Sequence, residues 1–337
     1  MLLKPAGQYP VIANALTNDG IVGYYDDYYR IQSPAVTVTA RGNIGHATAR
    51  MTNFTPIVRL LTIISKHDSY FLEHAINNIK IIVESTGVPQ LTVPQLSQYK
   101  IAFPVTMMEE KTIGSFFHHV DGLINLHQRQ TQKLKKLKQG LLHEMFPREG
   151  ESVPRLRFPG FTTNWKQQKL SDISDRYDNL RIPVAANLRM KGSTPYYGAN
   201  GIQDYVDGYT HDGEFILVAE DGANDLKNYP INYVNGRIWV NNHAHVLQAK
   251  EILADNRFMS YAMGRADIES VVVGGGRAKL NAEALMNISL HIPSLSEQKQ
   301  IGSFFRTLDD CIHCHEQYTV KLIHLKKGLL QKMFPQD

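Results

Sequence analysis

Two cysteines and a histidine near the end of the chain have the spacing of covalent haem attachment. Cys311, Cys314 and His315 spell Cys-x-x-Cys-His, and no other cysteine occurs among the 337 residues. The chain also contains a duplication, in which Leu123 and Leu126 take the places of the two cysteines. We therefore expect two small buried thiols on a helix instead of haem ligands, and no disulfide in a reducing compartment.

Two further histidines are candidates for metal chemistry. His243 and His245 stand two residues apart, so both side chains face one side of a predicted strand. Neither a cysteine nor a carboxylate stands at ligand spacing from them, and we expect no metal site. The sequence also lacks an Asn-Pro-Pro-Tyr methyltransferase motif, a Gly-x-x-x-x-Gly-Lys-Ser/Thr phosphate loop and a His-Glu-x-x-His zinc motif. We therefore expect no catalytic residue and no cofactor.

A repeated framework must position any functional residues of this chain. Residues 113–117 recur as residues 301–305, and residues 138–147 recur in large part as residues 326–335. Between 113–147 and 301–335, 19 of 35 positions are identical. Unrelated sequences of ordinary composition would share roughly two. The duplication predicts two similar structural units.

Both copies of the repeat predict a long helix with a heptad pattern. A helix of about 37 residues is on the order of 55 Å long, and it needs a partner along its length. The first copy places the heptad residues at Ile113, Phe116, Val120, Leu123, His127, Gln130, Leu134, Leu137 and Leu141, and the second at Ile301, Phe304, Leu308, Cys311, His315, Tyr318, Leu322, Leu325 and Leu329. We expect the two helices to pack as an antiparallel coiled coil. The polar positions 127, 130 and 315 either fix its register or lie partly exposed.

The segments that precede the helices predict domains of mixed α/β structure. Strands are expected at residues 100–103, 215–219, 237–240 and 288–292, and short helices at about 70–76 and 256–263. The fold class is therefore α+β with a pseudo-two-fold repeat. The expected boundaries are 1–106 for the first domain, 107–147 for the first long helix, 148–160 for a linker, 161–294 for the second domain and 295–337 for the second long helix.

The composition describes a globular protein of mild positive charge. Hydrophobic residues make up 43% of the chain and the formal net charge is +4. This charge is compatible with an anionic partner and does not require one. No run approaches the about 18 apolar residues that a membrane span needs, and the first residues lack the apolar stretch of a secretory signal. We expect a cytoplasmic protein that does not cross a membrane.

The order of these features resembles the specificity subunit of a type I restriction-modification system. That family alternates two target-recognition domains with two repeated helices, and the resemblance covers essentially the whole chain. The motifs that carry it are residues 292–301 before the second helix, residues 138–147 and 326–335 at the helix ends, residues 156–161 followed by Trp165, and residues 197–201.

The resemblance implies a DNA reader that is not itself an enzyme. Each target-recognition domain would bind one half of a split site in double-stranded DNA, and the coiled coil would set the spacing between the halves. The helices would also dock two modification subunits, which carry the adenine methyltransferase. Restriction subunits would complete the nuclease.

Residues that suit DNA contact occur in both domains. Asparagine and glutamine bond the adenine edge, and lysine and arginine meet phosphates. The candidates in the second domain are Tyr196, Tyr197, Asn200, Gln203, Arg189, Lys191, Lys227, Arg277 and Lys279, and those in the first domain are Asn14, Arg30, Arg41, Asn43 and Arg50. The alternative for each residue is a solvated turn, with the tyrosines packed into the domain.

The first domain is shorter at its start than the second. Residues 154–193 precede the landmark Thr194-Pro195, whereas residues 1–8 precede the matching Tyr9-Pro10. We therefore expect the first domain to lack the counterpart of Trp165 and of the strand that follows it. Either the start is truncated or this member of the family has a reduced first domain. The alternative function is an assembly scaffold, a truncated specificity subunit with only one competent DNA-reading domain.

Overall fold

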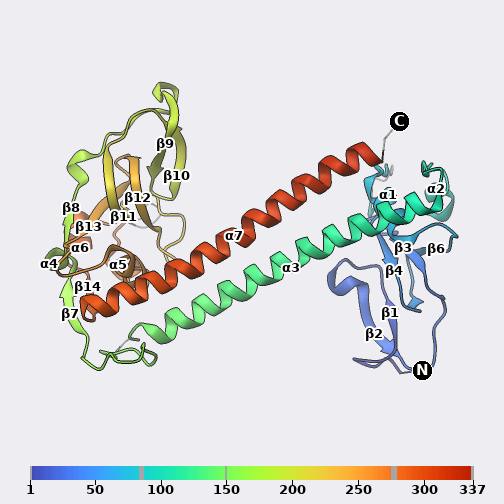
Figure 1. The fold of residues 1–337 in the computed structure, drawn as a ribbon, viewed down its shortest axis with the longest axis horizontal. Helices are drawn as coiled ribbons and strands as arrows, with labels where there is room; N and C mark the ends of the chain where they lie inside the picture. The colour runs from blue at the N-terminus through green and yellow to red at the C-terminus, as the bar shows by residue number, and fades with distance from the viewer. Residues whose placement is uncertain (1, 83–86, 149, 275–278, 335–337) are drawn as a thin grey trace. The chain divides into compact units, whose positions relative to one another are not determined.

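The computed structural model describes residues 2–82, 87–148, 150–274 and 279–334. They form two compact units: unit 1 comprises Met1–Thr131 with Cys314–Asp337, and unit 2 comprises Gln132–His313. Each of the two long helices therefore contributes residues to both units (Figure 1). Within the described ranges, no helix is long and apolar enough to cross a membrane.

Unit 2 is built on a six-stranded sheet of order β10-β9-β12-β11-β13-β8, and a separate pair joins β14 to β7. Its elements are β7 (Lys166–Lys169), α4 (Leu170–Ile173), β8 (Ser174–Arg176), the 3-10 turns η2 (Asp178–Leu180) and η3 (Ala186–Leu188), β9 (Lys191–Gly198), β10 (Gly201–Val206), β11 (His211–Ala219), β12 (Ile231–Val240), β13 (Ala244–Ala249), α5 (Asn256–Met263), the 3-10 turn η4 (Glu269–Val271), α6 (Ala282–Met286), β14 (Ser289–Ile292) and α7 (Leu295–Met333). The strands expected at 215–219, 237–240 and 288–292 and the helix expected at 256–263 are confirmed.

Unit 1 contains two smaller sheets, of order β4-β3-β6 and β2-β1-β5. Its elements are β1 (Tyr9–Ile12), the 3-10 turn η1 (Thr17–Gly20), β2 (Ile21–Tyr25), β3 (Ala35–Thr39), β4 (Ala47–Arg50), β5 (Thr55–Pro56), β6 (Leu60–Ile63), α1 (Ser69–Asn78), α2 (Val93–Leu96) and α3 (Met107–Met145). The helix expected at about 70–76 lies within α1 and is confirmed.

The two units share one strand register, although their sequences match poorly upstream of the long helices. Val36 of β3 lies opposite Ile63 of β6, just as Ile216 of β11 lies opposite Leu247 of β13. The parallel pairs agree as well, because β1 pairs with β5 as β9 pairs with β12. The duplication therefore extends through both domains and is not confined to the long helices.

The strand expected at residues 100–103 does not form, which corrects the sequence-based expectation. Its counterpart in unit 2, β14, forms because it is hydrogen-bonded to β7. A strand requires a neighbour that satisfies its backbone groups. Within the described part of unit 1, no strand pairs with residues 100–103, and this segment is an irregular connection.

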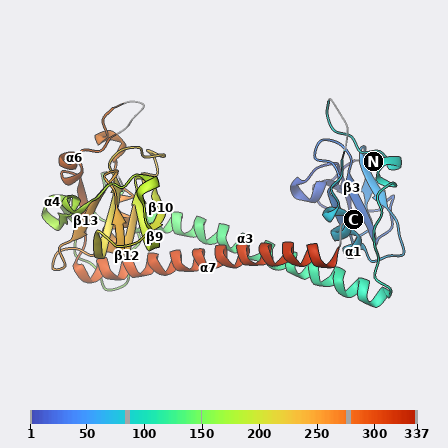
Figure 2. The same cartoon turned by 90° about the horizontal axis from the view of Figure 1, so that it is seen from above.

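A short helix docks on a long helix in the same way in both units. Asp68 caps α1 by accepting from the Phe71 amide (2.9 Å), and Asp255 caps α5 by accepting from the Phe258 amide (2.8 Å). In unit 2, α5 lies between the sheet and α7 (Figure 1), and in unit 1, α1 lies below β3 in the view of Figure 2. This arrangement connects each sheet to one end of each long helix.

The rings that fill this junction also correspond. In unit 1, Phe334 packs on Phe71 and Phe117 with ring centroids 5.0 and 5.8 Å apart. The equivalent cluster in unit 2 places Phe146 against Phe258 and Phe305, at 5.5 and 6.0 Å. The repeated phenylalanine at the end of each helix therefore has a packing role.

The long helices α3 and α7 pack antiparallel as a coiled coil. In unit 1, Lys326 donates to Asp121, and in unit 2, Lys138 donates to Asp309, with bonds of 2.6 and 2.5 Å. These two pairs join equivalent positions of the repeat. His127 and His315 meet within the coil, with their Nδ1 atoms 2.8 Å apart. Both side chains are also partly exposed, as one of the two expectations had it.

The heptad pattern predicted two rows of inward-facing residues on each long helix, and the prediction is correct for the first row and wrong for the second. Ile113, Val120 and their repeat partners face inward. The second inward row runs through Phe117 and Ile124, one residue later than expected. The expected residues that instead lie exposed are Phe116, Leu123, Leu137, Cys311, Tyr318 and Leu325.

Both cysteines are exposed, which corrects the expectation of buried thiols. The duplication correctly matched them with Leu123 and Leu126, but these leucines are 46% and 45% exposed. All four positions lie on the outward stripe of the helices. The cysteines and the matching leucines therefore occupy equivalent positions, as expected. The inference that a leucine position must be buried was wrong.

Candidate nucleic-acid interface

Three turns of unit 2 meet around a polar hollow of about 310 Å³. The turn between β9 and β10 provides Asn200, and Gln203 follows it at the start of β10. The segment after β11 provides Asp221 and Gly222, and the turn before β13 provides His243. Amide, carboxylate and imidazole groups together offer both donors and acceptors, which is what contact with a base edge requires.

Asn200 holds two of these turns together. Its Nδ2 donates to the Gly222 carbonyl (2.8 Å), and its Oδ1 accepts from the Asn224 amide (3.0 Å). Both ends of the side-chain amide are therefore bonded to backbone. This geometry gives Asn200 a structural role in the hollow. Because its side chain is also exposed, the expected base contact stays a prediction.

Asn14 plays the same part in unit 1. Its Nδ2 donates to the Arg41 carbonyl (2.8 Å), and its Oδ1 accepts from the Ala40 amide (2.7 Å). A third turn is bonded to the other two in both units. In unit 1 the Ala40 amide also donates to the Arg59 carbonyl (3.2 Å), and in unit 2 the Glu220 amide donates to the His243 carbonyl. Asn14 is thus a structural residue too, and the two units share one frame of turns.

The side chains of these turns that do not make the shared hydrogen bonds differ between the two units. In unit 2, the His243 ring contacts Asp221 (2.5 Å), and Gln203 lies exposed with its Oε1 3.5 Å from the Asn241 amide nitrogen. In unit 1, the corresponding positions are occupied by Arg41 and Arg59, and Asn43 is exposed in the same turn as Arg41.

Arg59 is a candidate that the sequence-based reasoning missed. It has a φ of 71°, in the left-handed region that residues other than glycine seldom adopt. Such backbone strain often marks a functional turn. The sequence carried no signal for it, since the positive φ is imposed by the turn between β5 and β6.

Two expected DNA contacts belong to the core of unit 2 instead. Tyr196 is only 1% exposed, and its hydroxyl bonds both the amide (3.0 Å) and the carbonyl of Val184. Arg189 stacks on the Tyr196 ring at 4.1 Å and donates to the same carbonyl. Tyr197 is half-buried against a second cluster, and burial raises the pKa of its hydroxyl. The burial of Tyr196 therefore corrects the expected DNA contact of this residue. Arg189 is partly buried, and its contact with DNA stays a prediction.

The basic candidates of unit 2 are dispersed. Lys191 on β9 and Lys227 after β11 are both exposed. Lys279 bonds Glu220 at 3.1 Å and lies beside Asp221 of the polar hollow, through a backbone bridge. Lys227 instead lines a second hollow of about 760 Å³ with Arg265. Arg277 lies outside the described residues.

The two remaining candidates of unit 1 lie apart from the frame of turns. Arg30 is exposed, with its amide bonded to the Phe54 carbonyl. Arg50 lies against the sheet, where its Nε donates to the Thr37 hydroxyl (2.9 Å) and burial lowers the pKa of its guanidinium. A guanidinium already bonded within the domain is a poor phosphate contact.

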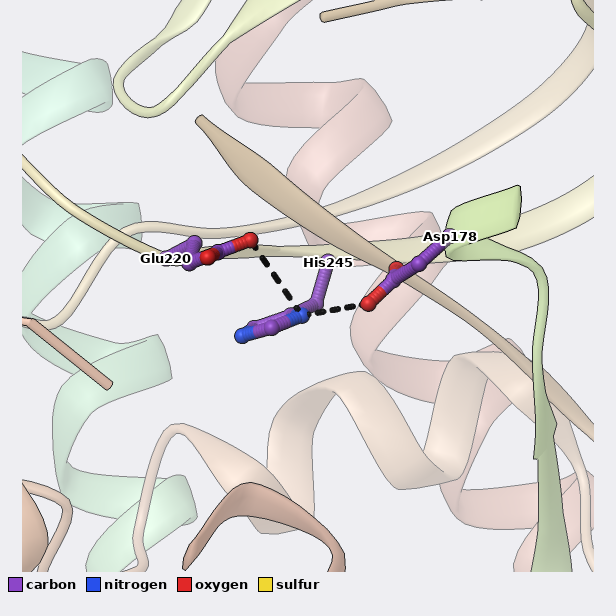
Figure 3. A group of neighbouring side chains, drawn as sticks. All are labelled: Asp178, Glu220 and His245. Carbon is purple, nitrogen blue, oxygen red and sulfur yellow. Dashed lines mark hydrogen bonds and ion pairs between the residues drawn. The ribbon is translucent and has the colours of Figure 1, made fainter. Parts of the chain in front are cut away.

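Unit 2 also contains a group of ionisable residues that the sequence did not connect. His245 lies between Asp178 (2.7 Å) and Glu220 (3.8 Å), as Figure 3 shows. Arg181 bonds Glu220 (2.7 Å), and Lys279 bonds it too. Although desolvation opposes the shift, the bonds from His245 and the Val246 amide hold the pKa of Asp178 below its usual range.

The geometry of this group is that of an ion-pair network. The second ring nitrogen of His245 bonds the Leu280 carbonyl at 2.9 Å, so both nitrogens already face acceptors. Arg181 and Lys279 balance the two carboxylates. The expectation of no metal rested partly on a lack of nearby carboxylates, and that reason was wrong because the fold brings Asp178 and Glu220 to His245. His243 contacts a different carboxylate, that of Asp221.

Comparisons with known proteins agree on one family. The family model for the type I restriction modification DNA specificity domain matches residues 2–136 and 162–323. A protein of Haemophilus influenzae named as a type I restriction enzyme specificity subunit is 45% identical over 142 residues, which are 42% of this chain and 36% of that protein. The MjaVIII specificity subunit of Methanocaldococcus jannaschii is 21% identical over 286 residues, 75% of this chain and 65% of the relative.

A solved structure shows the same fold. The S subunit of a type I restriction-modification system from M. genitalium superposes with a TM-score of 0.78 at 16% identity. The superposition covers 100% of this chain and 91% of that structure. The sequence matches are shorter, since this chain spans about a third of the length of the Haemophilus relative.

Proposed function

Since this chain belongs to the type I restriction-modification DNA specificity family, we propose that it is the DNA-reading subunit of such a system and is not itself an enzyme. Unit 1 reads one half of a bipartite site in double-stranded DNA, and unit 2 reads the other half. The proposed DNA-contacting surface consists of the turns that Asn14 and Asn200 hold together. The exposed side chains of these turns carry the hydrogen-bond donors and acceptors.

The observation that carries this proposal is one backbone frame with two different sets of side chains. Where unit 2 presents Asp221 and His243, unit 1 presents Arg41 and Arg59. A shared frame would place both sets at the same depth in a groove, and different side chains would select different bases. The pattern supports two unlike half-sites.

The outward stripe of the long helices supports a docking role for modification subunits. Apolar side chains are exposed along it, at Phe116, Leu123, Leu126, Leu137, Tyr318 and Leu325. Because the stripe occurs once on each helix, we propose two modification subunits, one for each copy of the repeat. The helices also set the spacing between half-sites, and restriction subunits complete the nuclease.

An assembly scaffold is the second candidate function, favoured by a specific observation in unit 1. In unit 2, β7, α4 and β8 complete the domain, and the described part of unit 1 has no counterpart of this segment. A scaffold of this kind would still bind modification subunits through the helices. It would read DNA through unit 2 alone.

The test is selection of duplex DNA by the full chain in complex with its modification subunits. We expect a split sequence to be enriched, with binding that weakens steeply as salt rises. Replacing Gln203 or His243 by alanine should relax one half-site by about 1–3 kcal/mol, and replacing Arg59 or Asn43 should relax the other. The exposed Lys299→Ala on α7 is the matched control and should leave both half-sites unchanged.

Three results would decide between the candidates. Enrichment of both half-sites, each sensitive to its own variants, supports the two-domain reader. Enrichment of only the Gln203-sensitive half supports the scaffold. An assembled complex that enriches no sequence would refute DNA reading by this chain.

A further inference from the structure

Unit 2 contains a hollow of about 290 Å³ that is lined by residues of α5, β12 and the two long helices. Four cationic side chains of the described residues line it, namely Lys138 of α3, Arg257 of α5, Arg265 just after α5, and Arg306 of α7. The carboxylate of Asp309 is also part of its wall. We call this place the arginine hollow. Its excess of positive charge favours an anionic ligand.

The lysine of the arginine hollow belongs to the internal structure of unit 2. Lys138 donates to Asp309 (2.5 Å), and the same carboxylate accepts from the Tyr261 hydroxyl (2.6 Å). The equivalent lysine and aspartate of unit 1 make the same pair. Because Lys138 and Asp309 neutralise each other, the charge offered to a ligand is that of the three arginines.

The ion pairs of two of these arginines lie at the surface. Arg306 contacts Asp310 at 3.1 Å, and the Arg257 guanidinium lies 3.9 Å from Glu214. The side chains in these two pairs are between 38% and 60% exposed, and Arg265 is exposed as well. Exposed ion pairs contribute little to stability, whereas arginine binds a phosphate through two parallel hydrogen bonds. A phosphate can therefore replace these partners.

The arginine hollow continues into the hollow of about 760 Å³ that Lys227 lines. The two hollows share three wall residues, Tyr229, Gly264 and Arg265. Lys227 follows Asp221 of the polar hollow in the same connection between β11 and β12. The larger hollow has a more balanced charge, because Asp267 and Glu269 line it too. Positive side chains therefore lie along a path from the segment after the recognition turn to α7.

The spacing of these side chains suits an extended anion. Arg257 and Arg265 are eight residues apart, which is on the order of 12 Å along a helix. One strand of duplex DNA carries a phosphate about every 3.4 Å along the axis, so such a span covers about three phosphates. A row of cations of this length therefore matches a DNA backbone, the polyanion proposed as the partner of this unit.

Unit 1 fills the equivalent place with a pair of stacked rings. Tyr70 stands directly before the core phenylalanine of α1, where unit 2 has Arg257. His118 stands directly after the core phenylalanine of α3, where unit 2 has Arg306. The Tyr70 and His118 rings stack with their centroids 3.9 Å apart. The two guanidinium groups are thus specific to unit 2, although both units share the helix junction.

We propose that the arginine hollow binds the phosphate backbone of double-stranded DNA beside the half-site that unit 2 reads. The inference rests on the proposed function and adds a phosphate-binding surface to it. Arginine on a phosphate positions the duplex and reads no base, so the hollow raises the affinity of unit 2 without changing its sequence preference. Unit 1 carries Tyr70 and His118 instead, and the two units hold the DNA backbone differently.

The test replaces two arginines by the residues of unit 1. Arg257→Tyr with Arg306→His installs a ring pair that the same helix junction accommodates in unit 1, so unit 2 should fold. Binding is measured with the full chain in complex with its modification subunits, on the selected duplex, over a series of salt concentrations. We expect the slope of log K against log salt to become less steep by about 2, and the affinity at about 0.1 M salt to fall at least about tenfold.

The enriched sequence and the assembly of the complex should stay unchanged in this variant, because the contact is to phosphates. A matched control removes two positive charges elsewhere on unit 2. Lys166→Ala with Lys299→Ala changes exposed positions that line neither hollow. This control should keep the salt slope of the wild-type complex.

Three results would overturn the proposal. An unchanged salt slope in the Arg257→Tyr, Arg306→His variant would mean that the hollow meets no phosphate. An altered half-site would assign the arginines to bases, and loss of assembly in sedimentation would assign the hollow to an acidic segment of a protein partner. A wild-type complex that selects no sequence would refute DNA reading, whereas the salt series on any duplex still tests the hollow, so the two failures are distinguishable.

Discussion

The junctions of α1 with α3 and of α5 with α7 make the same contacts with different residues. Glu110 accepts from the Asp68 amide (2.5 Å) where Gln298 accepts from the Asp255 amide (3.0 Å). A second equivalent pair differs more in chemistry, because His74 of α1 is matched by Tyr261 of α5. The Tyr261 hydroxyl donates to Asp309 (2.6 Å), whereas the His74 Nε2 lies 3.7 Å from Asp121. The backbone arrangement is therefore preserved while the charge and titration of the junction change.

A second contrast concerns the third residue of each long helix. Glu297 of α7 is almost fully buried, with its side chain 1% exposed, and it receives two bonds from Arg157, of 2.9 and 2.7 Å. Glu109 occupies the same position in α3 and is exposed. Arg157 precedes the segment β7-α4-β8, which has no counterpart in the described part of unit 1. The same glutamate thus depends on tertiary structure in one unit and is solvated in the other.

The largest expected effect is the loss of the Arg157 guanidinium. Arg157→Ala leaves the buried Glu297 carboxylate without its partner, and unit 2 should lose about 3–5 kcal/mol of stability. Hydrogen exchange at the amides of β11 and β13 measures this unit by itself. Glu109→Ala in unit 1 is the matched control and should change stability by less than about 0.5 kcal/mol. Equal losses of stability in the two variants would mean that the buried ion pair contributes no more to stability than an exposed glutamate.

Acid should weaken the junction of α1 with α3 before the junction of α5 with α7. Burial and the nearby Lys326 lower the pKa of His74 to about 4, from 6.5. Below pH 6.5 the unfolded chain binds the proton more readily than the folded chain, so stability falls between pH 6.5 and 4, by up to about 3 kcal/mol. Tyr261 stays neutral over this range because burial raises the pKa of its hydroxyl.

His74→Tyr tests this difference directly. The variant should flatten the acid response of unit 1, measured by hydrogen exchange at the amides of β3 and β4 across the same pH range. His119→Tyr, at an exposed position of α3, should leave the response in place. An unchanged response in His74→Tyr would place its origin at other groups.

The smallest expected effects concern four glycines of the long helices. A Cβ on Gly114 would lie 2.6 Å from the Phe71 amide nitrogen, and one on Gly302 would lie 2.9 Å from that of Phe258. Alanine at either position should cost about 1–3 kcal/mol by forcing the short helix away. Alanine at Gly140 or Gly328, where a Cβ meets nothing within 4 Å, should gain about 0.5–1 kcal/mol. Thermal unfolding distinguishes the signs, and a gain at Gly302 would disprove the close approach.

The functional candidates were partly found from sequence. Exposed residues such as Gln203 and Asn43 remain good candidates, because a polar residue in a glycine-bordered turn is seldom buried. Asn14, Asn200 and Tyr196 had the right chemistry, but the fold uses their polar groups internally. Whether an amide meets a base or a backbone depends on which turn lies beside it, and that turn is distant in sequence.

The sequence by itself determined the duplication, the two long helices, the limits of α5 and the family. These follow from identity and periodicity, which are local properties of the chain. Only the tertiary structure decided which helix stripe faces inward, because apolar residues occupy two adjacent stripes and both fit a heptad. It alone brought Asp178 and Glu220 to His245. Contacts between distant segments depend on how the elements pack, and no local pattern encodes that.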